Sequence, residues 1–272
     1  MKENGKTVQI IVAAHKPYRM PDDPLYLSLQ VGAEGKESIG YQRDDEGDNI
    51  SALNPYFCEL TGLYWGWKNL NSDYVGLVHY RRYFSIRPNG KDPWAGILKE
   101  AELSPLIPQI RLFVPAKRRY YIETLYSHYA HTHYAGQLDE TRKIIGEKYP
   151  DYLPAYDRTV NQRWGYMFNM LIAEKSLLDD YCSWLFDILF DLRTRIGKEQ
   201  EANLDTYQGR FYGRISEIIF NVWLSRRLEI GNLSPKEIKE IPFISTEKVD
   251  WKKKGTAFLK AKFIGERYQG SF

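Results

Sequence analysis

The sequence has few cysteines and no long apolar run. Only two cysteines, Cys58 and Cys182, occur among 272 residues, and both lie in apolar or aromatic stretches. We therefore predict buried free thiols and a reducing compartment rather than a disulfide framework. No stretch approaches the ~20 apolar residues of a membrane-spanning helix, and the short N-terminal apolar run predicts a strand instead of a signal peptide. These features predict a cytoplasmic protein that is not integral to a membrane.

Several motifs of common enzyme classes are also missing. The chain contains neither a G-x-G-x-x-G nor a G-x-x-x-x-G-K phosphate loop, no G-x-S-x-G elbow, and no sign of a reactive cysteine with a nearby base. These absences argue against a dinucleotide enzyme, a P-loop NTPase and a serine hydrolase.

Aromatic residues are plentiful, at 15% of the chain with 21 Tyr and 7 Trp. Their flat faces stack on sugar rings and bases, and they also fill ordinary cores. The hydrophobic content of 43% and charged content of 27% are typical of a globular protein with a substantial core.

Positive charge is concentrated at the C-terminal end. Residues 251–272 carry six Lys and Arg against Glu266, so the rest of the chain has a net charge of about −2 although the whole is +3. These cations alternate with aromatic and aliphatic residues, a pattern that suits an anionic lipid surface and equally suits a segment that closes over the core. We therefore divide the chain into a domain at 1–230 and a basic extension at 231–272.

The apolar pattern predicts strands separated by helices. We expect strands at Val8–Ala14, 27–33, 73–78, 111–114 and 166–173, and a loop at 40–53. Helices are predicted from Asn54-Pro55 onward and at 119–134, 137–148, 175–195 and 208–228. This order predicts an α/β fold with a mostly parallel sheet covered on both faces, in which ligands bind beyond the carboxyl ends of the strands.

Charged clusters follow three of these strands. His15 and Lys16 follow the first, an acidic loop at 44–49 follows the second, and His79-Tyr80-Arg81-Arg82-Tyr83 follows 73–78. Adjacent guanidinium groups suit phosphate oxygens, although in an extended segment only one of them would face the ligand. The alternative is an arginine pair that binds backbone carbonyls or a carboxylate.

The acidic loop contains Asp44, Asp45, Asp48 and Asn49. These side chains could accept from ribose hydroxyls or hold a divalent cation, but the spacing does not match a calcium-binding loop. A solvated turn is the alternative.

Three further groups are candidates for chemistry. His128, His131 and His133 lack the i, i+4 spacing of zinc helices, so we do not expect a metal there. Asn169, inside the predicted strand at 166–173, would bind a donor-sugar hydroxyl or satisfy neighbouring backbone. On the last long helix, Arg210 is a candidate donor contact, and Glu217 would either deprotonate an acceptor hydroxyl or simply pair with Arg214.

At these residues the sequence resembles a bacterial polysaccharide-biosynthesis family, long labelled a domain of unknown function, that includes capsular and exopolysaccharide glycosyltransferases, among them galactofuranosyltransferases. The matching stretches keep the family's order over residues 8–225: AAHKPYRMP, GDNISALNPYFCELTGLYWGWKN, DYVGLVHYRRYF, RRYYIETLYSHY, MFNMLIAEK, YCSWLFDILFDL and YQGRFYGRISEIIFNVWL.

The resemblance implies a single Rossmann-like α/β/α sandwich of the nucleotide-sugar glycosyltransferase A type with a helical C-terminal part. It also implies a UDP-sugar donor, with UDP-galactofuranose as one candidate, and a lipid-linked oligosaccharide acceptor. By this match His15, Lys16, the loop at 44–49 and the Arg81-Arg82 pair would line the donor pocket, and the helix at 207–224 would border the acceptor.

One departure from the wider fold class concerns metal. Many transferases of this fold hold Mn²⁺ or Mg²⁺ with an Asp-x-Asp after a central strand, where this chain has His-Tyr-Arg-Arg. We expect Arg81 or Arg82 to neutralise the leaving diphosphate instead. A metal at Asp44, Asp45 or Asp48 remains the alternative.

Two other functions compete with sugar transfer. One is a non-catalytic glycan- or nucleotide-binding protein. The other is a nucleic-acid binder, which is disfavoured because residues 1–250 are net acidic.

Overall fold

The computed structural model describes residues 5–247, apart from the side chains of 198–200 and 202, and these residues form two compact units. Unit 1 contains 5–116, 168–182 and 233–247, and unit 2 contains 117–167 and 183–232.

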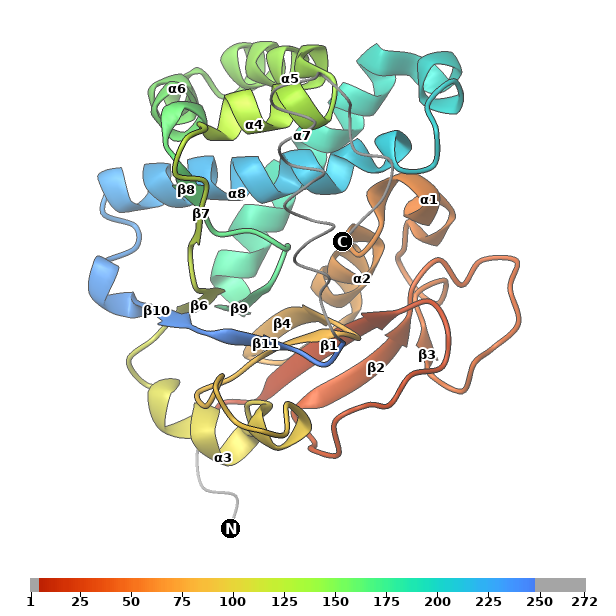
Figure 1. The fold of residues 1–272 in the computed structure, drawn as a ribbon, viewed down its shortest axis with the longest axis vertical. Helices are drawn as coiled ribbons and strands as arrows, with labels where there is room; N and C mark the ends of the chain where they lie inside the picture. Colours follow the sequence, from red (N-terminus) through yellow and green to blue (C-terminus); the bar gives the residue numbers. More distant parts are fainter. Residues whose placement is uncertain (1–4, 248–272) are drawn as a thin grey trace. The chain divides into compact units, whose positions relative to one another are not determined.

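Unit 1 is built on a mixed sheet with the order β10-β6-β9-β4-β1-β2-β3 (Figure 1). Of the six pairings along this path, four are parallel, and β9 runs antiparallel to both of its neighbours. β5 and β11 extend it by antiparallel pairing beside β4. The strands are β1 (Val8–Ala14), β2 (Tyr26–Gln30), β3 (Gln42–Arg43), β4 (Tyr74–His79), β5 (Arg82–Phe84), β6 (Leu112–Pro115), β9 (Leu171–Glu174), β10 (Ile238–Ile241) and β11 (Phe243–Ser245).

Short helices accompany this sheet. The described ones in unit 1 are η1 (Ser51–Leu53), α1 (Asn54–Phe57), α2 (Leu60–Asn69), η2 (Trp94–Gly96), α3 (Glu100–Leu103), η3 (Ser104–Leu106), η6 (Pro235–Glu237) and the start of α7 (Lys175–Ala202). The predicted helix does begin at Asn54-Pro55, but it breaks at Cys58, whose φ of 51° ends α1 before α2 starts.

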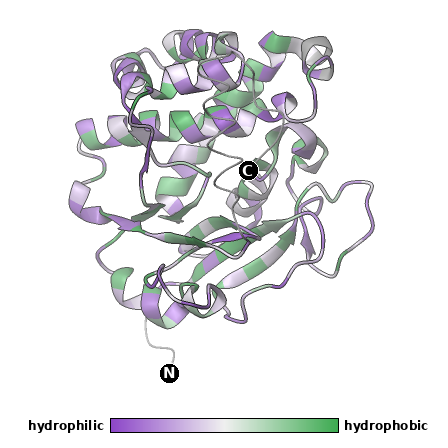
Figure 2. Ribbon diagram, viewed as in Figure 1, coloured by the Kyte–Doolittle hydropathy of each residue, from purple (hydrophilic) through white to green (hydrophobic). Residues whose placement is uncertain are grey.

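Side chains of β1 pack on both faces of the sheet. Ile10 and Val12 belong to a core that also contains Leu103 of α3. Ile11 points the other way, toward α2, where a Cβ on Gly66 would clash with the Ile11 Cδ1. Strand residues alternate between faces, so the glycine lets α2 approach the sheet closely. The hydropathy colouring shows these central strands as the apolar part of the unit (Figure 2). The predicted layered α/β fold is confirmed.

Unit 2 is mainly helical. Its elements are β7 (Arg118–Arg119), α4 (Leu125–Thr132), α5 (Ala135–Lys148), η4 (Pro150–Tyr152), α6 (Leu153–Asn161), β8 (Trp164–Gly165), the part of α7 from Ser183, η5 (Gln208–Arg210) and α8 (Phe211–Glu229). α8 contacts α5 and α6, and it is buried over most of its length, including the polar Glu217 and Asn221.

Some predicted boundaries were wrong for local reasons. The helix expected at 119–134 begins only at Leu125, because Thr124 caps it by accepting from the Ser127 N–H at 3.0 Å. The strand expected at 166–173 is reduced to β9, because Phe168 and Asn169 have φ values of 78° and 51°. α7 extends beyond 195 to Ala202, across a kink at Gly197.

The segment after residue 230, predicted as a basic extension, contributes β10 and β11 to the sheet of unit 1. Its basic residues at 252–267 lie outside the described residues, so the prediction of a membrane-surface role for them stays a prediction. Among the described helices, none combines the length and apolarity that crossing a bilayer requires. Among the described residues neither cysteine is in a disulfide; Cys182 is buried as predicted, whereas Cys58 is only half-buried.

Candidate functional site

Four parallel strands end at the same edge of the sheet in unit 1. The register pairs Ala13 with His79, Ala14 with Gln30, and Gln30 with Arg43. The segments that follow β4, β1, β2 and β3 therefore leave the sheet side by side, with strands about 4.8 Å apart. We call this edge the rim.

Aromatic and cationic side chains gather where β1 and β4 reach the rim. Tyr18 and Tyr80 stack with ring centroids 3.7 Å apart, and His15 meets both rings edge-on. The Lys16 ammonium lies 5.3 Å from the Tyr18 ring, and the Arg81 guanidinium lies 5.7 Å from the Tyr80 ring. Two flat rings flanked by cations suit a ligand that carries both a ring system and negative charge.

The two adjacent arginines have different surroundings. Arg81 pairs with the exposed Glu247 at 3.6 Å, and its backbone carbonyl accepts from the Thr246 N–H. The Arg82 guanidinium lies over the Phe168 ring at 4.1 Å. Arg82 begins β5, in which successive side chains alternate in direction, so the two guanidinium groups contact different neighbours.

His79, the last residue of β4, lies beside two polar residues, Glu59 and Asn169, of which the sequence analysis identified only Asn169. Its Nε2 donates to the Phe168 carbonyl at 2.6 Å and lies 4.0 Å from the Glu59 carboxylate. The Asn169 amide donates to the same carboxylate at 2.7 Å. Burial lowers the pKa of His79, the Arg82 charge adds to this effect, and Glu59 opposes it. The prediction that Asn169 lies in a strand was therefore wrong. It is part of a left-handed turn, a conformation that Asn tolerates well.

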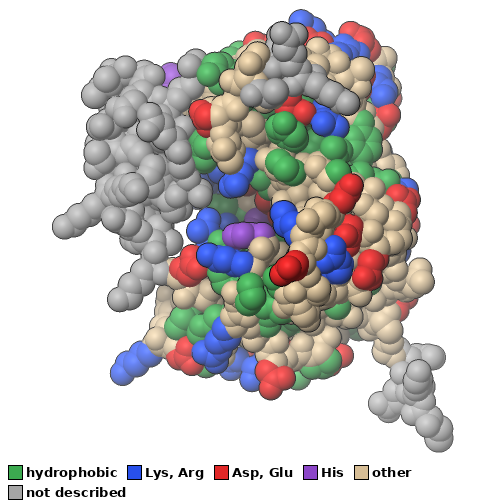
Figure 3. Space-filling model, turned by 90° about the vertical axis from the view of Figure 1, so that its right-hand side faces the viewer, with side chains coloured by type: hydrophobic (Ala, Val, Ile, Leu, Met, Phe, Trp, Pro, Cys, Tyr) green, Lys and Arg blue, Asp and Glu red, His purple; other side chains and the backbone are tan. Residues whose placement is uncertain are grey.

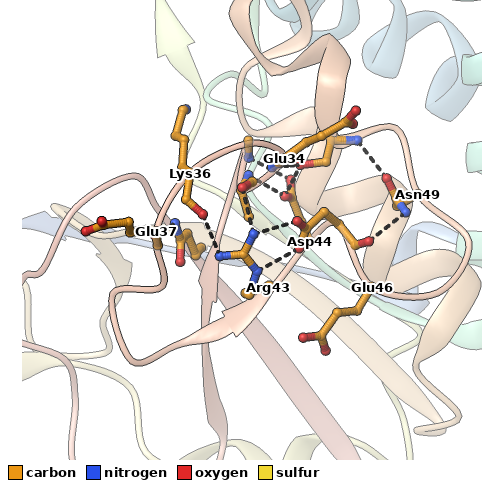
Figure 4. Close-up of polar contacts among 12 residues, drawn as sticks. Glu34, Lys36, Glu37, Arg43, Asp44, Glu46 and Asn49 are labelled. Atoms are coloured by element: carbon orange, nitrogen blue, oxygen red, sulfur yellow. Dashed lines mark hydrogen bonds and ion pairs between the residues drawn. The ribbon is translucent and has the colours of Figure 1, made fainter.

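Asp44 is a buried carboxylate that stabilises its own loop and does not face a ligand (Figure 4). It is fully buried, and each of its oxygens accepts two hydrogen bonds. The donors are the Gly32 and Ala33 N–H groups at 2.8 and 2.9 Å and the Ser51 and Thr61 hydroxyls at 2.5 and 2.7 Å. The prediction that Asp44 binds the donor or a metal was therefore wrong, because four donors already occupy a carboxylate that solvent does not reach.

The rest of the acidic loop is also bonded to its own surroundings. Asp45 forms a two-pronged pair with Arg43, which lowers the pKa of Asp45. Asp48 accepts from the Tyr64 hydroxyl at 3.1 Å, and the Asn49 amide donates to the Asp45 and Gly47 carbonyls. Within residues 5–247, no group of three His, Cys, Asp or Glu side chains has the arrangement of a metal site. Asp45 and Asp48 remain the metal candidates.

Unit 2 contains a cavity of about 60 Å³ that includes Glu217. Its walls are Arg118, Tyr120, Leu125, His128, Tyr129, Thr132, His133, Met167, Tyr207, Arg214, Glu217 and Ile218. Glu217 is only 6% exposed, and the Arg214 guanidinium lies 3.8 Å from its carboxylate. Arg210 is exposed and does not line the cavity.

Two cavity histidines are held in one tautomer. His133 Nδ1 donates to the Gln208 amide oxygen at 2.9 Å, and His128 Nδ1 donates to Glu123 at 2.8 Å. Burial lowers the pKa of each to about 4, with the Arg214 charge contributing at His133. Both rings are therefore neutral near pH 7, with an unprotonated Nε2 that can accept a hydrogen bond.

The three clustered histidines do not share one set of partners. His131 Nδ1 bonds to Glu123 at 2.6 Å beside His128, while His133 bonds elsewhere. Burial acts to raise the pKa of Glu123, but the bonds from the two histidines outweigh it and lower that pKa. Glu123 was missed by the sequence analysis, because an isolated Glu before a helix has no signature of its own.

The layered sheet, with its rim at the ends of parallel strands, defines a Rossmann-like α/β fold of the glycosyltransferase A type. The chain belongs to the family described as domain of unknown function (DUF4422), which matches residues 9–228.

Among solved structures, the chain is similar to the apo structure of the bifunctional glycosyltransferase WbbM, with a TM-score of 0.79 and 28% identity. The match covers 89% of this chain but 46% of that protein, so the chain spans about half of its length. No curated protein matches the chain.

Proposed function

We propose that the chain is a glycosyltransferase that moves a sugar from a UDP-sugar to a lipid-linked oligosaccharide in bacterial surface polysaccharide synthesis. Galactofuranose is the candidate sugar, inversion the expected stereochemistry, and the cytoplasmic face of the membrane the expected location. Similarity to WbbM over 89% of the chain supports the reaction class. The observation that carries the proposal is the register that sets His15-Lys16 next to His79–Arg82 at one rim.

The donor would bind at this rim, where open α/β sheets hold their ligands. The stacked Tyr18 and Tyr80 offer an aromatic surface for the nucleotide, and Lys16 and Arg81 supply positive charge beside it. Tyr18 is an addition to the residues suggested by the sequence. The Glu59–Asn169 pair next to His79 adds hydroxyl-binding groups for the sugar.

Arg81 and Arg82 would neutralise the leaving diphosphate. The Arg81–Glu247 pair is half exposed, and exposed pairs contribute only ~0–1 kcal/mol, so a diphosphate can displace Glu247 at little cost. Positioned guanidinium groups stabilise charge that develops on a leaving group, which is the role a divalent cation plays in other enzymes. A cation at Asp45 or Asp48 is the alternative.

Glu217 is the proposed general base. A carboxylate that is 6% exposed in a cavity with aromatic and basic walls can accept the proton of an acceptor hydroxyl. In the reaction, the acceptor oxygen bonds to the anomeric carbon as the bond from that carbon to the diphosphate oxygen breaks. The proton passes to Glu217, and UDP leaves with the bonding electrons.

The test is a thermal-shift panel of UDP, GDP, TDP and CMP, each with and without Mn²⁺, followed by hydrolysis assays with the matching sugar nucleotides. A ligand that binds only the folded state raises the melting temperature. We expect a shift with UDP that does not require Mn²⁺, and release of UDP from a UDP-sugar. Binding without turnover of any sugar nucleotide, with acceptor present, would favour the non-catalytic binding protein instead.

A further inference from the structure

A turn in unit 2 exposes two large apolar side chains next to each other. Tyr121 is 75% exposed and Ile122 is 56% exposed, while the preceding Tyr120 is buried. Single exposed apolar residues are common on protein surfaces, and Ile86 and Ile230 are other examples in this chain. An adjacent pair at the tip of a turn is different, because both side chains can enter the same apolar surroundings.

The turn is closed by hydrogen bonds and its backbone is unusual. Tyr121 has a φ of 56°, in the left-handed region that a bulky side chain rarely adopts. The Ile122 N–H donates to the Tyr120 carbonyl at 2.6 Å, which closes the turn. Arg163 donates to the Tyr121 carbonyl at 3.1 Å, and the Tyr120 N–H donates to the Arg163 carbonyl at 2.9 Å. The structure thus fixes two apolar side chains outward at some cost in backbone energy, which is typical of functional positions.

The surroundings of the turn are basic. Lys117, which precedes β7, and Arg119 of β7 lie close to the turn in sequence, and the adjoining β8 segment supplies Arg163. Arg119 and Arg163 are exposed, and Lys117 lies 4.5 Å from the ring of the half-buried Trp164. The acidic residue nearest in sequence, Glu123, is 3% exposed and bonded to His128 and His131. Residues 117–122 and 162–166 themselves include no carboxylate side chain that could offset these cations.

From this arrangement we propose that the Tyr121–Ile122 turn docks on an anionic phospholipid surface. Aromatic rings with a polar tip sit at the headgroup level, an isoleucine enters the acyl boundary, and nearby Lys and Arg attract anionic headgroups. The combination of an outward apolar pair with a cationic border fits a lipid surface better than an acidic protein partner. This contact is separate from any contribution of residues 251–272 and does not depend on the chemistry proposed above.

The experiment is co-sedimentation of the full chain with vesicles of phosphatidylcholine alone and with one fifth phosphatidylglycerol. We expect binding to the anionic vesicles that falls at least tenfold in the double variant Tyr121→Ser/Ile122→Ser, because two apolar side chains no longer enter the bilayer. The matched control Ile86→Ser/Ile230→Ser removes exposed apolar groups elsewhere and should bind within twofold of wild type.

Charge is tested by Arg119→Gln against Lys91→Gln, which removes an exposed cation distant in sequence. The first should weaken binding about fivefold and the second much less. Circular dichroism spectra and melting temperatures of the turn variants that match those of wild type establish that they are folded and that only lipid binding has changed. Equal binding of the turn variant and its apolar control, or no binding of wild type to anionic vesicles, would overturn the proposal.

Discussion

The Asn169 amide donates to the Glu59 carboxylate at 2.7 Å, which links two residues 110 positions apart in the sequence. Asn169 lies in a left-handed turn with a φ of 51°, and Glu59 precedes α2. Both lie beside His79 at the rim. Asn169 therefore contributes in two ways. It adopts the positive φ that the turn requires, and its side-chain amide holds the Glu59 carboxylate at the rim.

Substitution of Asn169 separates these two contributions. Asn169→Gly keeps the positive φ and loses the bond to Glu59, which should cost about 1.5–3 kcal/mol in free energy of unfolding. Asn169→Ala loses the same bond and also strains the backbone, so it should cost about 1 kcal/mol more. Urea denaturation measures both values. Equal stabilities of the Ala and Gly variants would contradict the role of the turn.

Asp44→Asn should be strongly destabilising. An amide cannot accept four hydrogen bonds as the buried carboxylate does, and its NH₂ group would face donors, so we expect a loss of about 2–4 kcal/mol. Asp45→Asn, which weakens a more exposed pair with Arg43, should cost less than about 1 kcal/mol. If the denaturation curves of the two variants coincide, the four hydrogen bonds to Asp44 do not stabilise the loop as described.

Glu217→Gln should abolish most turnover while the fold is retained. Loss of a general base typically lowers kcat by about 10²–10⁴-fold, and Gln preserves the shape of the side chain. Glu229→Gln on the same helix is the control, since Glu229 pairs with Arg158 and Ser225 at the end of α8. Steady-state rates with a UDP-sugar and acceptor measure the effect. A variant that loses stability but keeps its rate would make Glu217 a structural partner of Arg214.

Stability should depend on pH through His133. Burial lowers its pKa from an ordinary 6.5 to about 4, so between these values the unfolded chain binds a proton that the folded chain does not. The contribution is fully present above pH 6.5 and is lost as the pH falls toward 4, by about 2 kcal/mol at pH 5.

His133→Asn, whose amide can replace the bond from Nδ1 to Gln208, should remove that part of the pH dependence. Urea denaturation at pH 7 and pH 5 gives the difference for both proteins. A variant that loses as much stability as wild type between these two pH values would show that His133 does not titrate as described.

Much of the sheet could be predicted from the sequence because apolar periodicity reports burial. β1 and β4 are short apolar runs. The cationic residues come immediately after them in the sequence, so their position at the strand ends could be predicted. The break at Cys58 and the turn at Phe168-Asn169 could not be predicted, since positive φ values at these residues depend on tertiary contacts. The surroundings of the individual carboxylates were harder to predict than the strands. Asp44 and Asp45 are adjacent in sequence, yet one is fully buried and the other forms a surface pair, and only packing against Ser51 and Thr61 distinguishes them.

The central claim is that the rim binds a nucleoside diphosphate through Arg81 and Arg82, and calorimetric binding of UDP and uridine tests it most directly. Wild type, Arg81→Gln, Arg82→Gln and the control Arg87→Gln, an exposed arginine paired with Glu102, are compared. We predict that at least one of the first two variants raises the Kd for UDP at least tenfold and that both leave the Kd for uridine within about threefold, while the control matches wild type. UDP affinity that is unchanged in both rim variants would contradict the account.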